Sequence, residues 1–234
     1  MVKIDLVTGF LGSGKTTFLK KYAKRLMEQG QNIGILENDF GAVNVDMMLL
    51  QELEGEQCEL EMISGGCDPE THRRRFRTKL IAMGMCGYDR VLVEPSGIYD
   101  MDEFFDVLHE EPLDQWYEIG NVIAVVDARL EDTLSPEAEY LLASQAANAG
   151  CMILSKCDTA TEEQRQNTIA HLKRSLAALG CKQRADQKIL CEGAEPLPDQ
   201  EFAAILSCGY YIASYEKPDF AKGQAFESLY FLDM

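Results

Sequence analysis

Near its amino terminus the chain reads Gly9-Phe10-Leu11-Gly12-Ser13-Gly14-Lys15-Thr16. This octapeptide matches the phosphate-binding pattern GxxxxGK(S/T) in full. Glycines let successive backbone N–H groups turn toward a phosphate, while the lysine reaches the β- and γ-phosphates and the threonine hydroxyl holds Mg²⁺. The alternative is a glycine-rich turn with an incidental lysine, which the position between an apolar segment and a helical pattern disfavours. We therefore expect a P-loop with nucleotide contacts from Gly9, Leu11, Gly12, Ser13, Gly14, Lys15, Thr16 and Thr17.

Strand-like and helical segments alternate along the chain around this loop. Apolar runs predict strands over residues 2–8, 32–36, 90–93, 121–126, 151–154 and 188–191. Helical patterns lie over residues 17–29, 71–84, 102–109, 136–148, 161–179 and 200–208. The strands are nearly continuous in Val, Ile and Leu, as in a parallel sheet covered on both faces. We predict an α/β fold, a three-layer P-loop NTPase domain with a mostly parallel central sheet.

Two further segments have strand patterns of another kind. In residues 57–62, Cys58, Leu60 and Met62 alternate with two glutamates, so we expect a hairpin arm beside the main sheet with one solvated face. Residues 225–232 also read as a strand, close to the last residue of the sequence. We assign residues 1–215 to the P-loop domain and 216–234 to a C-terminal extension ending in that short strand.

The composition excludes several classes of function. With 22 Lys+Arg against 39 Asp+Glu, the 234 residues carry a net charge of −17, which repels nucleic acid and anionic membrane surfaces. No apolar stretch approaches the about 20 residues that a membrane-spanning helix needs. The P-loop starts at Gly9, which leaves no room for a signal peptide. We therefore expect a cytoplasmic protein without nucleic-acid or membrane partners, whose eight cysteines are thiols and mostly small core residues.

A second motif indicates which base is bound. The buried run 151–154 ends in Ser155-Lys156-Cys157-Asp158, which is similar to the guanine-specificity motif NKxD of GTPases. A carboxylate at Asp158 accepts from both N1–H and N2–H₂ of guanine, and the stem of Lys156 packs on the base. Ser155 replaces the usual asparagine, so we expect the loop to lose the amide hydrogen bonds that brace it. The alternative for the whole motif is a polar turn at the end of a strand. Cys191 lies where GTPases place a further loop that touches guanine.

A third motif supplies an acidic residue at the end of an apolar strand. Glu94-Pro95-Ser96-Gly97 follows the run 90–93, which is the Walker B arrangement, with a solvated strand end as the alternative. Glu94 reaches Mg²⁺ directly or through water, Gly97 lets a backbone N–H approach the γ-phosphate, and Asp39 is a further magnesium candidate beside Thr16. We expect Lys15 and Glu94 to be catalytic. No residue declares itself as the water-positioning group, so unaided hydrolysis should be slow.

Together these motifs resemble the CobW family of P-loop GTPases, relatives of the HypB and UreG metallochaperones. The resemblance is carried by GFLGSGKTT at 9–17, ENDFG at 37–41, EPSG at 94–97, VVDA at 125–128 and SKCD at 155–158. It implies a GTP- and GDP-binding, Mg²⁺-dependent, slowly hydrolysing switch that delivers a divalent transition metal or metallocofactor to a client metalloprotein or cofactor-dependent enzyme. The family's C-terminal β-rich domain looks absent or truncated to the strand at 225–232.

The chain departs from the family where the metal would bind. Members typically carry CxCC, whose thiolates suit Zn²⁺ or Co²⁺, whereas Ser64-Gly65-Gly66-Cys67-Asp68-Pro69-Glu70 keeps only the first cysteine. Cys67 with Asp68, Glu70, His72 or Cys58 is the candidate transition-metal site, and an inert loop thiol is the alternative. Ala42 stands where the family usually has a second glutamate.

The basic cluster at residues 72–77 follows this loop. We interpret it as a solvated helix face with Phe76 and Leu80 directed inward; the alternatives are a docking surface for an acidic partner, or an arginine donated to the γ-phosphate across a homodimer. His109 and His171 are interpreted as ordinary helix-surface residues.

Three functions remain open. They are a GTPase switch in metal or metallocofactor delivery, a nucleotide-dependent interaction module without a metal role, and a P-loop kinase that uses ATP on a small molecule. A preference for guanine over adenine nucleotides would exclude the kinase, and metal binding that requires Cys67 would separate the first two.

Overall fold

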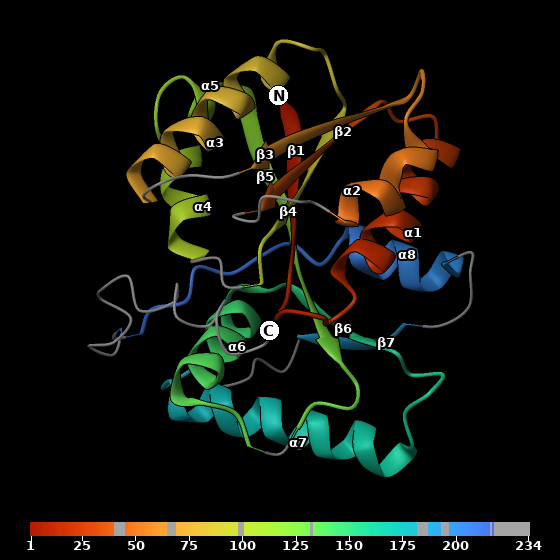
Figure 1. The fold of residues 1–234 in the computed structure, drawn as a ribbon, viewed down its shortest axis with the longest axis vertical. Helices are drawn as coiled ribbons and strands as arrows, with labels where there is room; N and C mark the ends of the chain where they lie inside the picture. Colours follow the sequence, from red (N-terminus) through yellow and green to blue (C-terminus); the bar gives the residue numbers. More distant parts are fainter. Residues whose placement is uncertain are drawn as a thin grey trace.

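The computed structural model describes residues 1–39, 45–64, 69–97, 101–131, 133–181, 187–192, 197–215 and 217. Its centre is a seven-stranded sheet in the order β3-β2-β4-β1-β5-β6-β7, and all neighbouring strands are parallel (Figure 1). The strands are β1 Val2–Thr8, β2 Ile33–Asp39, β3 Cys58–Ser64, β4 Arg90–Pro95, β5 Tyr117–Asp127, β6 Cys151–Ser155 and β7 Lys188–Cys191. The predicted α/β class with a parallel sheet is confirmed.

Helices cover both faces of this sheet. They are α1 Lys15–Glu28, α2 Val45–Leu50, α3 Pro69–Gly84, α4 Met101–Leu108, α5 Leu113–Trp116, α6 Pro136–Asn148, α7 Glu162–Ala178 and α8 Asp199–Leu206, with a short 3₁₀ turn, η1, at Gln51–Leu53. Figure 1 shows α1, α2 and α8 together on one side of the sheet. Helices α3, α4, α6 and α7 pack on the opposite face.

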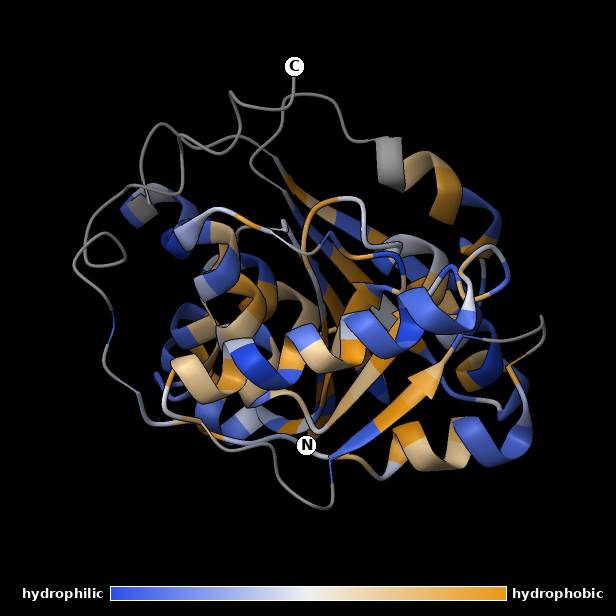
Figure 2. Cartoon of the chain, turned by 90° about the horizontal axis from the view of Figure 1, so that it is seen from below, coloured by the Kyte–Doolittle hydropathy of each residue, from blue (hydrophilic) through white to orange (hydrophobic). Residues whose placement is uncertain are grey.

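Alternation within the strands produces two cores. On β1, Leu6 belongs to the core beneath α3, α4, α6 and α7, whereas the next residue, Val7, belongs to the core beneath α1 and α8. Successive strand side chains point to opposite faces, so a strand covered on both sides must be apolar at nearly every position. Figure 2 shows hydrophobic strands in the interior and helices with hydrophilic residues on their outer sides.

Local capping explains why two helix predictions were accurate. Ser135 accepts a hydrogen bond from the backbone of Ala138, and Pro136 occupies the first helical turn of α6. Thr161 and Gln164 form a reciprocal capping box at the start of α7. These residues accept from N–H groups that the first turn of a helix leaves unpaired. The residue at which each helix begins is therefore specified by its own local sequence.

A buried polar network lies inside the sheet near the amino ends of its strands. Asp5 of β1 is completely buried and accepts hydrogen bonds from Tyr22 Oη at 2.7 Å, Arg90 Nη1 at 2.5 Å and the backbone N–H of Asn121 at 2.8 Å. Burial, followed by the charge of Asp5, raises the pKa of Tyr22. A Cβ atom at Gly120 would lie 2.3 Å from Asp5 Oδ1, so the network requires glycine there. This network joins β1, α1, β4 and β5.

Several details of the prediction are wrong. Residues 58–64 form no hairpin arm; β3 is a parallel edge strand on β2, and an edge strand with one half-solvated face shows the same alternation. His171 is only 3% exposed on α7, whereas His109 is exposed as predicted. Of the seven described cysteines, Cys58 and Cys151 are buried, three are half-buried against the cores, and Cys86 and Cys191 are exposed, so the prediction of mostly core cysteines holds only in part. The short helices α2 and α5 were not predicted from the sequence.

Two predictions fall wholly or partly outside the described residues. The strand at 225–232 lies there, and so does most of the C-terminal extension, so the division at residue 215 stays a prediction. None of the helices in the described ranges is both long and apolar enough to cross a membrane.

Candidate functional site

The P-loop connects β1 to α1 at the carboxyl edge of the sheet. Gly12 and Gly14 have φ angles of 71° and 88°, in the left-handed region that favours glycine. A Cβ atom at Gly9 would lie 2.2 Å from Val125 O, so the loop can pass β5 only without a side chain. Lys15 and Thr16 begin α1 and are 8% and 7% exposed. The remaining predicted contacts lie on the same turn, with Ser13 buried and Leu11, Gly12 and Thr17 exposed.

Two of the three predicted magnesium ligands, Thr16 and Glu94, meet at this turn. Thr16 Oγ1 donates a hydrogen bond of 2.7 Å to Glu94 Oε1, and Glu94 is 3% exposed at the end of β4. A hydroxyl and a carboxylate are hard oxygen donors of the kind Mg²⁺ prefers. Asp39 ends β2, but its side chain lies outside the described part of the structure. The pair Thr16 and Glu94 therefore fits a magnesium ion by donor chemistry.

One acidic residue beside this pair was not predicted from the sequence. Glu37 of β2 is in register with Glu94 of β4 and is 2% exposed, so two buried carboxylates occupy neighbouring strands. Its sequence signal is the acidic first position of the ENDFG segment, Glu37, for which no ligand role was predicted. Around them, buried side-chain atoms of Thr8, Asn38 and Ser96 have no hydrogen-bond partner among the described residues. Such polar atoms suit a polar ligand at the carboxyl edge.

Gly97 links the Walker B segment to the P-loop. A Cβ atom at Gly97 would lie 2.5 Å from the backbone nitrogen of Leu11, so only glycine permits this approach. Gln145 of α6 donates a hydrogen bond of 3.2 Å to the Gly97 carbonyl oxygen. The predicted residues Gly97 and Leu11 are thus in direct contact.

The predicted base-recognition motif is bonded to the P-loop. Ser155 Oγ donates to Ser13 O at 2.5 Å, and Lys156 Nζ donates to Gly12 O at 2.8 Å. The expectation that serine removes the bracing of this loop is therefore wrong. The end of β6 is in ordinary van der Waals contact with the loop, since a Cβ atom at Gly14 would lie 3.5 Å from Ser155 Cβ. A hydroxyl at this distance replaces the amide that the motif usually supplies.

Asp158 and Cys191 border the same region. Asp158 is exposed two residues after Lys156, and Cys191 is exposed at the end of β7, in register with Leu154 of β6. The Cys157 thiol, between Lys156 and Asp158, lies 3.2 Å from Leu154 O. These residues lie at the carboxyl ends of β6 and β7 or just beyond them.

Burial and a neighbouring thiol should make Cys157 unreactive. Desolvation, followed by a hydrogen bond with Cys191, raises the pKa of Cys157 to about 12, and burial raises that of Cys58 to about 11. Because these pKa values lie well above 8, both thiols stay protonated at pH 8. The thiolate is the nucleophile, so they gain reactivity only as the pH approaches these values. We expect iodoacetamide at pH 8 to label the exposed Cys86 before Cys157 or Cys58. Peptide mass spectrometry of samples taken during the reaction measures the labelling rate of each cysteine. Equal labelling rates would contradict the raised pKa values.

The proposed transition-metal ligands do not all come together. Cys67 and Asp68 lie outside the described residues, and Glu70 is exposed in the first turn of α3. Cys58 begins β3 while the loop follows its end, about 20 Å away at the rise of a strand, so Cys58 cannot contribute. His72 is completely buried, with Nδ1 3.7 Å from Glu103 Oε1, and faces α4. Within the described ranges no three His, Cys, Asp or Glu side chains form a metal-binding group.

The basic cluster on α3 behaves as a helix face. Arg73 and Arg77 form ion pairs with Glu110 at 2.6 and 2.9 Å, while Phe76 and Leu80 are completely buried. The interpretation as a solvated helix face with Phe76 and Leu80 directed inward is confirmed for the arginines, whereas His72 at the start of the cluster is completely buried. The pairs hold α3 against the turn that follows α4.

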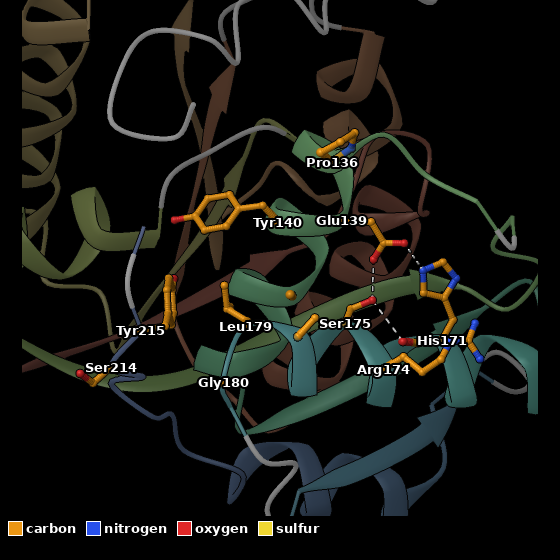
Figure 3. Close-up of a pocket in the computed structure, with 12 residues that line it drawn as sticks. Pro136, Glu139, Tyr140, His171, Arg174, Ser175, Leu179, Gly180, Ser214 and Tyr215 are labelled. Carbon is orange, nitrogen blue, oxygen red and sulfur yellow. Dashed lines mark hydrogen bonds and ion pairs between the residues drawn. The ribbon is translucent and has the colours of Figure 1, made fainter. Parts of the chain in front are cut away.

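Two cavities differ in their position relative to the P-loop. One of about 470 Å³ adjoins the P-loop and is lined by Gly12, Asp127 and Arg129 among others. A larger one, of about 780 Å³, lies between α6 and α7, away from the P-loop (Figure 3). There His171 Nε2 lies 2.5 Å from Glu139 Oε1, and Ser175 Oγ donates to Glu139 Oε2 at 2.6 Å. This pairing holds the two helices together, which explains why His171 is buried.

Sequence comparison identifies relatives of this chain. Residues 3–182 match the family model of the CobW/HypB/UreG nucleotide-binding domain. The zinc chaperone YjiA of Escherichia coli is 29% identical over 172 residues, which cover 70% of this chain and 52% of YjiA. The zinc-regulated GTPase metalloprotein activator 1 of Schizosaccharomyces pombe is 24% identical over 168 residues, which cover 69% of this chain and 40% of that protein. The chain thus spans about half the length of these relatives, or less.

Solved structures share the fold. The Zn(II)-bound YjiA GTPase from E. coli superposes with a TM-score of 0.51 and 21% identity, over 97% of this chain and 69% of that chain. HypB from Helicobacter pylori, in complex with nickel, gives a TM-score of 0.51 and 16% identity over 82% and 78% of the two chains. The family match includes the P-loop, the Glu94 strand and the loop of Lys156. The chain belongs to the CobW/HypB/UreG family, through its nucleotide-binding domain.

Proposed function

We propose that this chain binds GTP and GDP with Mg²⁺, hydrolyses GTP slowly, and acts as a nucleotide switch in the delivery of a metal or metallocofactor to a client protein. One observation carries the nucleotide part of this proposal. Ser155 and Lys156 are hydrogen-bonded to backbone carbonyls of the P-loop, so the loop that would read the base and the loop that would hold the phosphates are parts of one site.

The roles of the residues follow from their positions. Lys15 and the loop amides would bind the phosphates, and Asp158 would accept from N1–H and N2–H₂ of guanine. Thr16 and Glu94 would hold Mg²⁺, which supplies charge stabilisation at the β- and γ-phosphates. Family members that are named GTPases support hydrolysis as the reaction. Slow turnover is expected because, in the part of the chain that the structure describes, no side chain near Glu94 is an evident water-positioning group.

The metal part of the proposal rests on the relatives and on Cys67. YjiA is named a zinc chaperone, which supports Zn²⁺, or the similar Co²⁺, as cargo. A second function, a nucleotide-dependent interaction module without a metal role, is favoured by one observation. Cys58 lies at the opposite end of β3 from Ser64, and His72 is completely buried with its Nδ1 atom 3.7 Å from Glu103 Oε1, so neither is a ready partner for a metal bound after Ser64. Zn²⁺ binding that depends on GTP and on Cys67 would decide for the chaperone.

We further propose that residues 1–215 form the GTPase domain and that 216–234 are an extension from it. The client would be a metalloprotein or a cofactor-dependent enzyme. We also propose a homodimer, in which an arginine from a second copy of the chain would reach the γ-phosphate and complete the site.

Calorimetric titration with Mg²⁺-GDP and Mg²⁺-ADP tests the nucleotide assignment. We expect wild-type protein to prefer GDP at least about tenfold, which corresponds to about 1.4 kcal/mol, because adenine lacks the donor pair that Asp158 would bind. Asp158→Ala should remove the preference. Glu118→Ala, at the exposed amino end of β5, is the matched control and should keep it. Equal binding of GDP and ADP by wild type would favour the ATP-dependent kinase instead.

A further inference from the structure

Asp127, the last residue of β5, lies between the P-loop and the loop of Lys156. Its Oδ2 atom accepts a hydrogen bond of 2.7 Å from Lys156 Nζ, and the same ammonium group donates to Gly12 O at 2.8 Å. Asp127 is in register with Ser155 of β6, so Lys156, the next residue, leaves the adjacent strand one residue beyond the level of Asp127. The Lys156 ammonium is therefore held from two sides.

The backbone of Lys156 shows that this arrangement is imposed by its surroundings. Lys156 has a φ of 55°, and among the described residues it is the one non-glycine residue with a positive φ. A side chain at such an angle is strained, and the strain persists only where neighbouring contacts fix the conformation. The Lys156 carbonyl oxygen accepts from the backbone N–H groups of Thr159 and Ala160 at 3.1 Å, and the side-chain bonds to Asp127 and Gly12 O add to that fixation. Strain of this kind is typical of functional positions.

The second oxygen of Asp127 is also occupied. Oδ1 accepts from the backbone N–H of Arg129 at 2.8 Å, and the Arg129 guanidinium lies 3.3 and 3.4 Å from the two carboxylate oxygens. Burial alone would raise the pKa of Asp127, but the hydrogen bonds from Arg129 and Lys156 outweigh it and lower the pKa. Asp127 is therefore a fixed negative charge with its orientation set by the loop after β5. Its side chain is 23% exposed, so solvent competes only partly for Lys156.

We propose that Asp127 is a positioning residue of the nucleotide site, which holds the Lys156 side chain across the P-loop in the orientation needed to pack on a guanine base. This inference rests on the proposed guanine-nucleotide function. Asp127 itself need not touch the nucleotide. Without the carboxylate, the ammonium group would keep one protein acceptor, Gly12 O, and the lysine stem would sample other rotamers before each binding event.

A double-mutant cycle tests the proposal. The variants are Asp127→Asn, which keeps the shape and removes the charge, Lys156→Met, which keeps an apolar stem, and the two combined. We expect Asp127→Asn to raise the Kd for Mg²⁺-GDP by about tenfold, because the amide carries no charge and its single oxygen replaces the two that accept from Arg129 N–H and from Lys156 Nζ. The double variant should bind no more weakly than Lys156→Met alone, because Asp127 acts through Lys156. Asp127→Glu, which restores the charge, should recover part of the affinity.

Steady-state kinetics and thermal unfolding separate positioning from a merely structural role. Positioning predicts that Asp127→Asn raises the KM for GTP and leaves kcat within about twofold, since binding is lost uniformly. Glu118→Gln removes a carboxylate from the exposed opposite end of the same strand and should change neither constant. A thermal midpoint for Asp127→Asn close to that of Glu118→Gln excludes general unfolding as the cause.

Several outcomes would overturn the proposal. Wild-type Kd in Asp127→Asn, together with a raised Kd in Lys156→Met, means that Lys156 is positioned without Asp127. Additive losses in the double variant mean that Asp127 acts independently of the lysine. If wild type binds GDP no better than ADP and Lys156→Met changes neither Kd, the proposed guanine function itself is wrong, and this inference falls with it.

Discussion

A Glu94→Gln variant is expected to lose about 100-fold or more in kcat for Mg²⁺-dependent GTP hydrolysis, because charge stabilisation by a correctly held cation contributes several kcal/mol to such transition states. Glu94 is 3% exposed, and Oε1 accepts the hydrogen bond of Thr16 at 2.7 Å. Glutamine keeps the volume and can still accept from Thr16, but it supplies no negative charge at the site. The substitution thus removes the electrostatic contribution while preserving the packing.

Single-turnover phosphate release over a range of Mg²⁺ concentrations measures this effect. Asp106→Asn serves as the matched control, since Asp106 is an exposed carboxylate on α4. It should retain wild-type kcat and the same Mg²⁺ dependence. GDP affinity in excess EDTA should be similar in Glu94→Gln and wild type, which would show that the P-loop is intact. If Glu94→Gln hydrolyses GTP within threefold of wild type at every Mg²⁺ concentration, Glu94 is no magnesium ligand.

The parts of the fold that the sequence predicts well are those determined locally. The strand at Val2–Thr8 and the helix at Pro136–Asn148 have the predicted bounds, because continuous apolar runs and a Ser-Pro start act within a few residues. The P-loop belongs to the same class, since its glycines are required by the turn itself. For such segments the neighbouring residues are sufficient to specify the conformation.

The features that the sequence did not predict depend on partners far away in the chain. His171 is buried because Glu139, on another helix, accepts its hydrogen bond. Edge position, and not hairpin formation, explains the alternation in β3, and periodicity alone cannot distinguish the two. The bond from Ser155 to Ser13 joins residues 142 positions apart. Residue type and spacing indicate what these side chains can do, whereas the packing of distant segments determines which partner they meet.

The same dependence on distant partners makes the Asp5 network the most sensitive point for stability. Arg90→Met is expected to lower the free energy of unfolding by about 3–5 kcal/mol, because it leaves the buried carboxylate of Asp5 without its cation. Asp5 is completely buried and Arg90 is 5% exposed, so water cannot replace the lost partner.

Replacing both members of the pair should be milder than replacing one. In Asp5→Leu with Arg90→Met, neither charge is left uncompensated, so we expect part of the loss to be recovered. Tyr22 and the backbone of Asn121 would still lose an acceptor, which limits the recovery. Urea unfolding followed by circular dichroism gives the free energies of unfolding. The control is Lys3→Met, which removes an exposed cation two residues before Asp5 in β1. A loss below about 1 kcal/mol for Arg90→Met would mean that solvent reaches Asp5 and that the network does not hold β1, β4 and β5 together.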